Sequence, residues 1–199
     1  MKRLLILILF FGIVLAGVSS RAAVYNFTPS QPDLQDLDHY NFKSWGINWT
    51  HLGEQITGAT LTFKNIWDWR PEYDQLYMHL LDNPRLGVRT YWDNQGGGDN
   101  WAGRGPLITT WNDPVGGHAR NFDLVVNFDA TLLGYLNTYA ADGRFGFGFD
   151  PDCHYFNDGV SLTVTTKSNP PTVPTPEPAT MALFSLGLAG LGMIRRKKS

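Results

Sequence analysis

The residues best suited to chemistry lie in a polar loop at residues 150–159, between two apolar stretches. This loop offers four side chains with carboxylate or amide oxygens, those of Asp150, Asp152, Asn157 and Asp158. Calcium takes six to eight hard oxygen ligands of this kind. The spacing differs from that of an EF-hand, which has Gly at the sixth position and Glu at the twelfth. The loop therefore predicts a calcium site of another kind.

The same loop has a second interpretation, in which its polar residues make turns. Asp150-Pro151 is typical of the start of a turn, and Asn157-Asp158-Gly159 of a turn that leads into a strand. One histidine and one cysteine, His154 and Cys153, are too few for a zinc site. Cys153 is the only cysteine, so the chain has no intramolecular disulfide; a buried apolar role and a thiol open to a partner both fit it.

A second polar stretch, at residues 91–101, is rich in glycine and contains two tryptophans. No strand-loop-helix pattern with a lysine follows it, so it is not a phosphate-binding loop. Aromatic faces stack on sugar rings, while amides and carboxylates bind hydroxyl groups, so the stretch favours a carbohydrate ligand. The candidate ligand-binding residues are Trp92, Asp93, Asn94, Asp99, Asn100 and Trp101. Of the seven tryptophans in the chain, we expect two to be exposed.

Short strands must position these loops. Alternation of apolar and polar residues predicts half-buried antiparallel strands within residues 60–63, 76–80, 122–128 and 160–164. Further candidate strands are residues 25–27, 42–49, 86–92, 107–111 and 145–149. Residues 130–140 have helical spacing instead and predict one short helix. The expected fold is all-β, an antiparallel β-sandwich with the jelly roll as one candidate form.

Two glycines interrupt the apolar side chains of the strand candidate at residues 145–149. Gly146 and Gly148 lie on the same face, because successive side chains of a strand point to opposite faces. A strand face without side chains is typical of a place where another backbone or a ligand comes close. We therefore expect a close approach over this strand.

The central part of the chain is acidic. The whole chain has a formal net charge of -2, but seven of its 16 Lys and Arg residues lie within residues 1–22 and 176–199. Residues 23–175 contain nine basic and 17 acidic side chains, a net charge of -8. Nucleic acids and anionic lipid surfaces require basic patches, so the composition argues against both as partners and permits cations.

Catalytic signatures are missing from the sequence. Glu54 and Glu72 are the only glutamates within residues 23–175, and no spacing of aspartates singles out an acid and a nucleophile for glycoside hydrolysis. The chain also lacks the G-x-S-x-G elbow of a serine hydrolase. We therefore expect a protein that is not an enzyme.

The N-terminus has the layout of a secretory signal peptide. Lys2 and Arg3 precede a 15-residue apolar run at residues 4–18. Ser20 and Ala22 then supply the small residues that a cleavage site needs. We expect cleavage after Ala22.

The tail has three parts: a Pro-Glu-Pro triplet, an uncharged run of 16 residues at 179–194, and a terminal basic cluster. A helix of that length measures about 24 Å, short of the ~30 Å hydrocarbon core, so it spans a bilayer only with thinning or snorkelling arginines. The basic cluster should stay cytoplasmic, which leaves the preceding residues outside. The residues of the triplet and the cluster are Pro176, Glu177, Pro178, Arg195, Arg196, Lys197 and Lys198.

This order of parts closely resembles the PEP-CTERM sorting signal of Gram-negative bacteria, which is also labelled the ice-binding protein C-terminal domain. The label does not make the rest of the chain an ice binder, and an ordinary C-terminal anchor is the alternative. The resemblance implies an exosortase as partner, a transpeptidase-like membrane enzyme that would cleave near the triplet. The protein would pass through the inner membrane and reach the cell surface or an exopolysaccharide matrix. The resemblance covers about an eighth of the chain and implies nothing about what the rest does.

The expected organisation is a signal peptide at residues 1–22, a β-sandwich at 23–168, a proline-rich spacer at 169–175 and a sorting signal at 176–199. The expected function is binding of carbohydrate or matrix material, with calcium as the candidate cofactor. A purely structural matrix protein and a polysaccharide hydrolase or lyase are the alternatives. Exposed tryptophans on a flat sheet face would favour binding, a face of threonines and charges would favour a structural role, and a deep groove with paired aspartates would favour an enzyme.

Overall fold

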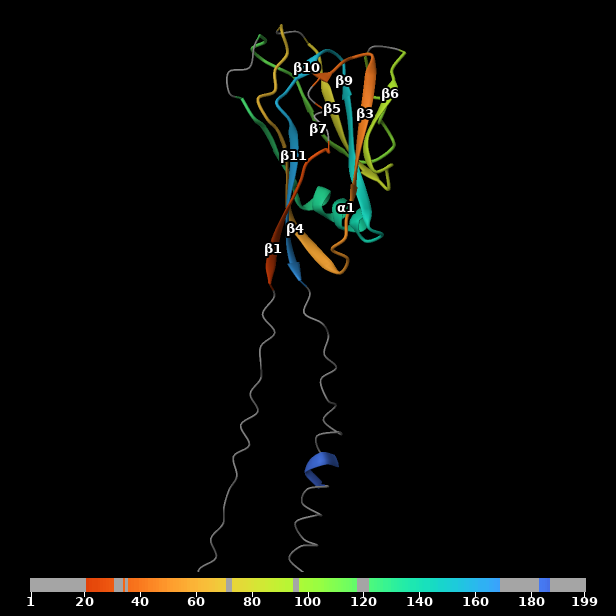
Figure 1. The fold of residues 1–199 in the computed structure, drawn as a ribbon, viewed down its shortest axis with the longest axis vertical. Coiled ribbons are helices and arrows are strands. Elements are labelled where there is room, and N and C mark those ends of the chain that lie inside the picture. Colours follow the sequence, from red (N-terminus) through yellow and green to blue (C-terminus); the bar gives the residue numbers. More distant parts are fainter. Residues whose placement is uncertain are drawn as a thin grey trace, which may run out of the picture. The chain divides into compact units, whose positions relative to one another are not determined.

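The chain divides into a large β-rich unit, residues 1–169, and a short C-terminal unit, residues 170–199 (Figure 1). The computed structural model describes residues 21–30, 34, 36–70, 73–94, 97–117, 122–168 and 183–186. Most of the predicted signal peptide, the proline-rich spacer and most of the predicted membrane helix lie outside the described residues. No helix within those ranges is long and apolar enough to cross a membrane.

Four strands make the first sheet, and all their pairings are antiparallel. The order is β1 (Ala22–Phe27), β11 (Val160–Ser168), β4 (Glu54–Phe63) and β8 (Leu124–Asn127). The alternation predicted at residues 60–63 and 160–164 is confirmed. Thr62 is only partly buried between the fully buried Leu61 and Phe63, and so is Thr163 between Leu162 and Val164. The first residue of β1, Ala22, pairs with Lys167, so the predicted cleavage after Ala22 would remove one pair of this ladder.

The outer face of this sheet has a row of polar side chains across all four strands. Asn26, Thr163, Thr60 and Asn127 are successive partners in the ladders. The Thr163 hydroxyl donates to Asn26 Oδ1 at 2.8 Å, and the Thr60 hydroxyl donates to Asn127 Oδ1 at 2.9 Å. The outward positions of the described strands in this sheet include several threonines and no aromatic residue.

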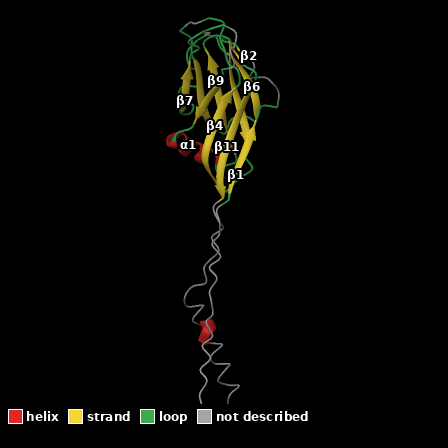
Figure 2. Ribbon diagram, turned by 90° about the vertical axis from the view of Figure 1, so that its left-hand side faces the viewer, coloured by secondary structure: helices red, strands yellow, loops and turns green. Residues whose placement is uncertain are grey.

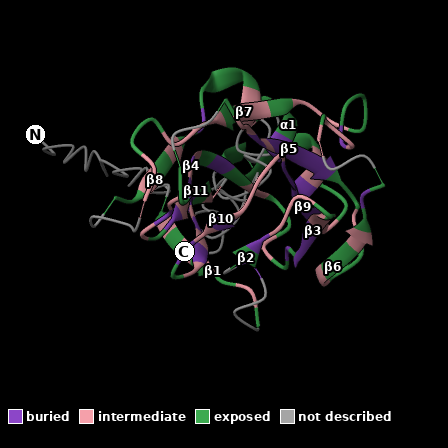
Figure 3. Cartoon of the chain, turned by 90° about the horizontal axis from the view of Figure 1, so that it is seen from above, coloured by how far each residue is buried: buried purple, intermediate pink, exposed green. Residues whose placement is uncertain are grey.

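Five antiparallel strands make the second sheet. The order is β6 (Gly87–Trp92), β3 (Asn41–Asn48), β9 (Arg144–Pro151), β5 (Leu76–Asp82) and β7 (Leu107–Trp111). Central strand β9 is buried from Phe145 to Pro151, because the first sheet covers one of its faces and a loop covers the other. Figure 3 shows purple, buried segments along β5 and β9.

Figure 2 shows the strands of the two sheets in yellow. Their inner faces share one hydrophobic core. Phe63 of β4 meets Phe149 of β9 edge to face, with ring centroids 5.3 Å apart. Leu61 and Leu162 of the first sheet join Met78 and Leu80 of β5 in the same buried cluster. Burial of such side chains stabilises each by about 1.5–3 kcal/mol, so this core holds the two layers together. The predicted all-β antiparallel fold is confirmed.

The helix predicted at residues 130–140 is confirmed as α1 (Ala130–Ala140). Asp129 caps it, since its carboxylate accepts from the Leu132 N–H at 2.8 Å. Asn137 on α1 then fastens it to β4, because its side chain accepts from Ile56 N at 2.8 Å and donates to Ile56 O at 2.9 Å. α1 packs against β4, β5 and β9 (Figure 1).

A two-stranded sheet joins two loops at one end of the sandwich. β2 (Asp36–Leu37) pairs with β10 (Tyr155–Phe156), with Leu37 opposite Tyr155 and Asp36 opposite Phe156. This pairing brings the segment before β3 next to the segment after β9. Residues 118 and 120 positions apart in the chain therefore become neighbours here.

Candidate functional site

The two candidate loops of the sequence meet on the outer face of the second sheet. The segment that connects β6 to β7 folds over β9, where carboxylates fasten it. Asn100 N–H donates to Asp150 Oδ2 at 2.5 Å, and Gly98 N–H donates to Asp152 Oδ1 at 2.7 Å. Residues 98–100 and 150–152 therefore form one polar site rather than two.

Trp101 holds this connecting segment down. Its ring lies over Gly148, where an added Cβ would be 2.7 Å from ring atoms, and the side chain is only 6% exposed. At Gly146 an added Cβ would be even closer to its neighbour, 2.3 Å from the carbonyl oxygen of Trp45. The expectation of a close approach over these glycines is confirmed. The Trp101 ring and the Trp45 backbone, both parts of the same chain, therefore cover strand β9.

Asp99 anchors the same segment through two contacts. Its Oδ1 accepts from Trp101 N at 3.0 Å, and its Oδ2 lies 2.9 Å from His79 Nε2. The other ring nitrogen of His79 lies 3.1 Å from Gly105 O. His79 on β5 is 97% buried. Its two contacts hold the segment at Asp99 and again at Gly105.

The carboxyl group of Asp150 is the most unusual group of the site. It is 1% exposed, and its Oδ1 has no hydrogen-bond partner among the described residues. Burial raises the pKa of Asp150 to about 6, and the nearby charges of Asp93 and Asp99 act in the same direction. Burial also raises the pKa of Asp152. A buried carboxyl group with an unused oxygen and other aspartates nearby offers the kind of ligand that a hard cation takes.

The other two residues of the predicted calcium set lie apart from these contacts. The Asn157 side chain donates to Leu34 O and accepts from Gly159 N at 2.9 Å. Asp158 Oδ2 accepts from Asn65 Nδ2 at 2.9 Å. These bonds match the turn interpretation for Asn157 and Asp158. Asp150 belongs instead to strand β9, opposite Tyr77, so the predicted turn at Asp150-Pro151 is wrong.

Of the six predicted carbohydrate-binding residues, Trp92 and Asn94 are exposed, while Asp93 and Trp101 are buried. The Trp92 indole N–H donates to Asn94 Oδ1 at 2.6 Å, which orients the ring. Asp99 and Asn100 are half-buried in the contacts with His79 and Asp150. The expectation of two exposed tryptophans is confirmed, by Trp69 and Trp92.

The structure adds residues that the sequence pattern did not single out. Tyr40 lies against Trp92, with ring centroids 5.9 Å apart and planes within 8° of parallel. The two side chains are 50% and 66% exposed. His39 lies against Tyr40 and His154 against Trp69, so aromatic rings continue along the same end of the sandwich. The sequence contains one feature that could have drawn attention to these residues. The dipeptide His-Tyr occurs twice, in Asp38-His39-Tyr40 and in Cys153-His154-Tyr155.

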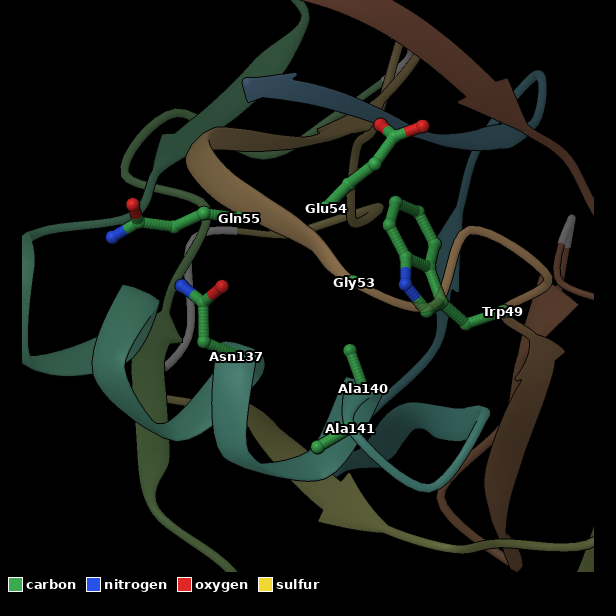
Figure 4. A pocket seen from close by; sticks show the side chains of 7 residues that line it. All are labelled: Trp49, Gly53, Glu54, Gln55, Asn137, Ala140 and Ala141. Carbon is green, nitrogen blue, oxygen red and sulfur yellow. The ribbon is translucent and has the colours of Figure 1, made fainter. Parts of the chain in front are cut away.

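A hollow of about 320 Å³ lies beside α1, lined in part by Trp49, Glu54 and Asn137 (Figure 4). The Glu54 carboxylate accepts from the Tyr25 hydroxyl at 2.9 Å and from the Thr166 hydroxyl. The bond from Thr166 is the main reason that the pKa of Glu54 is lowered. Since Glu54 joins strands and Asn137 fastens the helix, these polar groups stabilise the fold, and we assign the hollow no chemistry.

The comparison with known families identifies the tail. Residues 174–197 match the PEP-CTERM protein-sorting motif. The resemblance inferred from the triplet, the apolar run and the basic cluster is confirmed. This motif implies an exported protein that an exosortase sorts to the cell surface, and it covers the tail alone. No curated protein matches the chain.

Proposed function

We propose that the β-sandwich of this exported protein is a binding module for polysaccharide at the cell surface or in the surrounding matrix. The observation that carries the proposal is the pair of exposed, nearly parallel rings of Tyr40 and Trp92. Large aromatic side chains exposed together are uncommon on a soluble domain without a partner. Their faces stack on the C–H faces of sugars, and Asn94 supplies amide groups for hydroxyls.

The strand order supports this proposal by analogy. With β2, β6 and β10 left out, the chain passes between the two sheets in the order of a jelly roll, a form that lectin domains share. Fold alone does not decide function, so the argument depends on the aromatic pair. We propose that the module is not an enzyme and that calcium is its structural cation, held by Asp150 and Asp152. The cation would neutralise carboxylates that burial and the charges of neighbouring aspartates otherwise disfavour.

The test is binding of the full-length chain, purified in detergent, to the surface polysaccharides of its producing cell and to a glycan array. We expect Trp92→Ala to weaken binding by about 10- to 30-fold, since a central aromatic contact contributes up to about 2 kcal/mol. Tyr73→Ala is the matched control, because Tyr73 is an aromatic residue with 89% exposure that is not part of the Tyr40–Trp92 pair. Equal losses in both variants, or no binding to any polysaccharide, would contradict the proposal.

A structural role without a ligand is the second candidate, and the outer face of the first sheet favours it. That face presents Thr60, Thr62 and Thr163 and no aromatic residue at the described strand positions. Threonines paired across strands stabilise a sheet by about 0.2–1 kcal/mol per pair without any ligand. A wild-type chain that binds no polysaccharide but whose deletion weakens the matrix would support this candidate.

The sorting signal gives a prediction of its own in living cells. We expect a chain with Glu177→Gln, and with neutral residues in place of the terminal basic cluster, to remain in the inner membrane. The cluster orients the tail by the positive-inside rule, and the triplet is what the exosortase is inferred to recognise. Fractionation followed by blotting measures the destination, with Glu72→Gln as the matched control. Delivery of the tail variant to the surface at the wild-type level would refute this prediction.

A further inference from the structure

Three side chains that can bind metal converge at the end of the sandwich where β2 meets β10. Asp38 and His39 lie between β2 and β3, and His154 lies between β9 and β10. Since Leu37 pairs with Tyr155, antiparallel register places residue 38 beside residue 154. The convergence is therefore set by the backbone and does not depend on a chance contact of long side chains.

The distances among the three side chains fit a small metal ion. Asp38 Oδ1 lies 3.3 Å from His39 Nδ1 and 3.3 Å from His154 Nε2. One donor atom from each of the three side chains lies within 4.8 Å of the others. Zinc binds nitrogen and oxygen at about 2.0–2.2 Å in a tetrahedron, whose edge is then about 3.3–3.6 Å. The two measured separations match that edge, and they exceed the usual 2.7–2.9 Å of a charge-assisted hydrogen bond.

The surroundings hold the three side chains in place. Tyr40 N–H donates to Asp38 Oδ1 at 3.3 Å, and Asn41 N–H donates to Asp38 O at 2.8 Å. The ring of His39 lies against Tyr40, with centroids 4.0 Å apart. His154 lies near Trp69 at 5.7 Å and near Phe156 at 6.1 Å. Each of the three ligating side chains is about a quarter to a third exposed, so an ion can reach them from solvent.

The donor set decides the class of ion. Two imidazoles and one carboxylate suit zinc and other divalent transition metals, whereas calcium takes oxygen ligands alone. Three protein ligands also leave a fourth position for water or for a group of a ligand. We propose that Asp38, His39 and His154 form a binding site for a divalent transition metal ion, with zinc as the best fit. This site is separate from the cation proposed at Asp150 and does not depend on polysaccharide binding.

A second cluster within the described ranges, formed by Asp68, Asp74 and Cys153, is the weaker candidate. Burial, together with the charges of the two carboxylates, raises the pKa of Cys153 to about 11. Zinc binds the thiolate, so an ion at this cluster would first have to displace a tightly held proton. The histidine site requires no thiolate, since its ligands are two imidazole nitrogens and a carboxylate oxygen.

The test is a titration of the untagged full-length chain with zinc in detergent, after treatment with a chelator and without added polysaccharide. Calorimetry should give one saturable equivalent, and cobalt should give the visible absorption of a tetrahedral site. We expect His154→Gln and His39→Gln each to weaken zinc binding at least about 100-fold, since loss of mere supporting contacts already costs 10–100-fold. His51→Gln, a histidine outside the cluster, and Cys153→Ser should bind as the wild type does.

Two results would overturn the proposal. One is the absence of a saturable equivalent in the wild-type chain. The other is zinc binding that survives both histidine substitutions, or that is lost in Cys153→Ser while both histidine variants keep it. Circular dichroism of each variant separates loss of a ligand from loss of the fold, and Asp38→Asn gives a third variant that keeps the size of the side chain. Failure here leaves the polysaccharide proposal untouched, because that assay contains no zinc.

Discussion

At pH 7.5 and without calcium, Asp150→Asn is expected to unfold at a higher temperature than the wild type. The Asp150 side chain is 1% exposed, and its pKa is raised to about 6 from 3.8. The folded state therefore disfavours the ionised carboxylate by about 3 kcal/mol relative to the unfolded chain. An amide removes that charge and still offers an oxygen to the Asn100 N–H. We expect a gain of about 1–3 kcal/mol in the free energy of unfolding.

The sign of the pH dependence follows from the raised pKa. A carboxyl group that holds its proton more tightly when folded stabilises the fold at low pH. That contribution is complete below about pH 4, is lost as the pH rises through about 6, and is absent above it. The difference in unfolding temperature between Asp150→Asn and the wild type should therefore grow from about pH 4 to pH 7 in the presence of a chelator. A difference that is constant over this range would contradict the assignment to Asp150.

Calcium should reverse the ranking of the two proteins. A cation at 1,000 times its dissociation constant stabilises the folded state by about 4.1 kcal/mol, or about 8–16 °C for a domain of this size, which exceeds the advantage of Asp150→Asn. Asp150→Asn should lose most of this shift, because the buried charge is what draws the ion. Tryptophan fluorescence of the full-length chain in detergent, with calcium and with chelator, measures both effects.

Asp158→Asn is the control that distinguishes a calcium ion held at Asp150 and Asp152 from one held by the loop at residues 150–159. The sequence grouped Asp158 with Asp150, whereas the structure pairs Asp158 with Asn65 and leaves Asp150 with Asn100. Asp158→Asn should therefore keep the calcium shift. If it loses the shift as fully as Asp150→Asn does, the ion binds in the loop at residues 150–159 as the sequence predicted. If the wild type shows no shift, the calcium proposal is wrong.

The parts of the fold that the sequence predicted are those governed by local pattern. The period-2 alternation at residues 160–164 and the helical spacing at 130–140 both depend on neighbours within a few residues, and β11 and α1 confirm them. The turn at Asp150-Pro151 failed because both residues continue the pairing of β9 with β5, opposite Tyr77 and Leu76. That pairing depends on residues far away in the chain, and it outweighed the local preference for a turn.

The candidate sites were predicted less completely, for the same reason. The sequence singled out the loops around residues 92–101 and 150–159, yet it did not indicate that they are bonded to each other. The bare glycines of β9 did predict that something would cover them. That the cover is Trp101, 47 residues before Gly148, follows only from the sheet order. His39 was missed because its partner His154 is 115 residues away.

Gly148→Ala is the second substitution for which we expect a large effect. Its Cβ would lie 2.7 Å from the Trp101 ring, closer than folded proteins tolerate. The ring cannot slide aside freely, because Phe42 and Tyr91 pack on it at centroid distances of 5.2 and 5.8 Å. Overpacking of this kind costs about 1–3 kcal/mol, or a fall of about 3–10 °C in the unfolding temperature. Thermal unfolding followed by circular dichroism measures the fall.

Gly134→Ala provides the matched control, with the opposite sign. Gly134 lies inside α1, and an added Cβ would meet nothing within 4 Å. Alanine in a helix is about 0.5–1 kcal/mol more favourable than glycine, so this variant should be more stable than the wild type. The same chemical change thus has opposite outcomes at the two positions. Equal stability of Gly148→Ala and the wild type would mean that Trp101 does not lie on β9.

A double variant shows whether the clash with Trp101 causes the loss of stability in Gly148→Ala. Trp101→Leu alone should destabilise the fold, because it removes much of a buried ring from the contact with β9. Combined with Gly148→Ala, it should cost less than the two separate losses together, by about 0.5–3 kcal/mol, since the smaller side chain leaves room for the new methyl group. Additive losses would place the effect of Gly148→Ala elsewhere in the strand. Because Trp101 also positions Asn100 and Gly98 against Asp150 and Asp152, Gly148→Ala should weaken the calcium response, whereas Gly134→Ala should leave it unchanged.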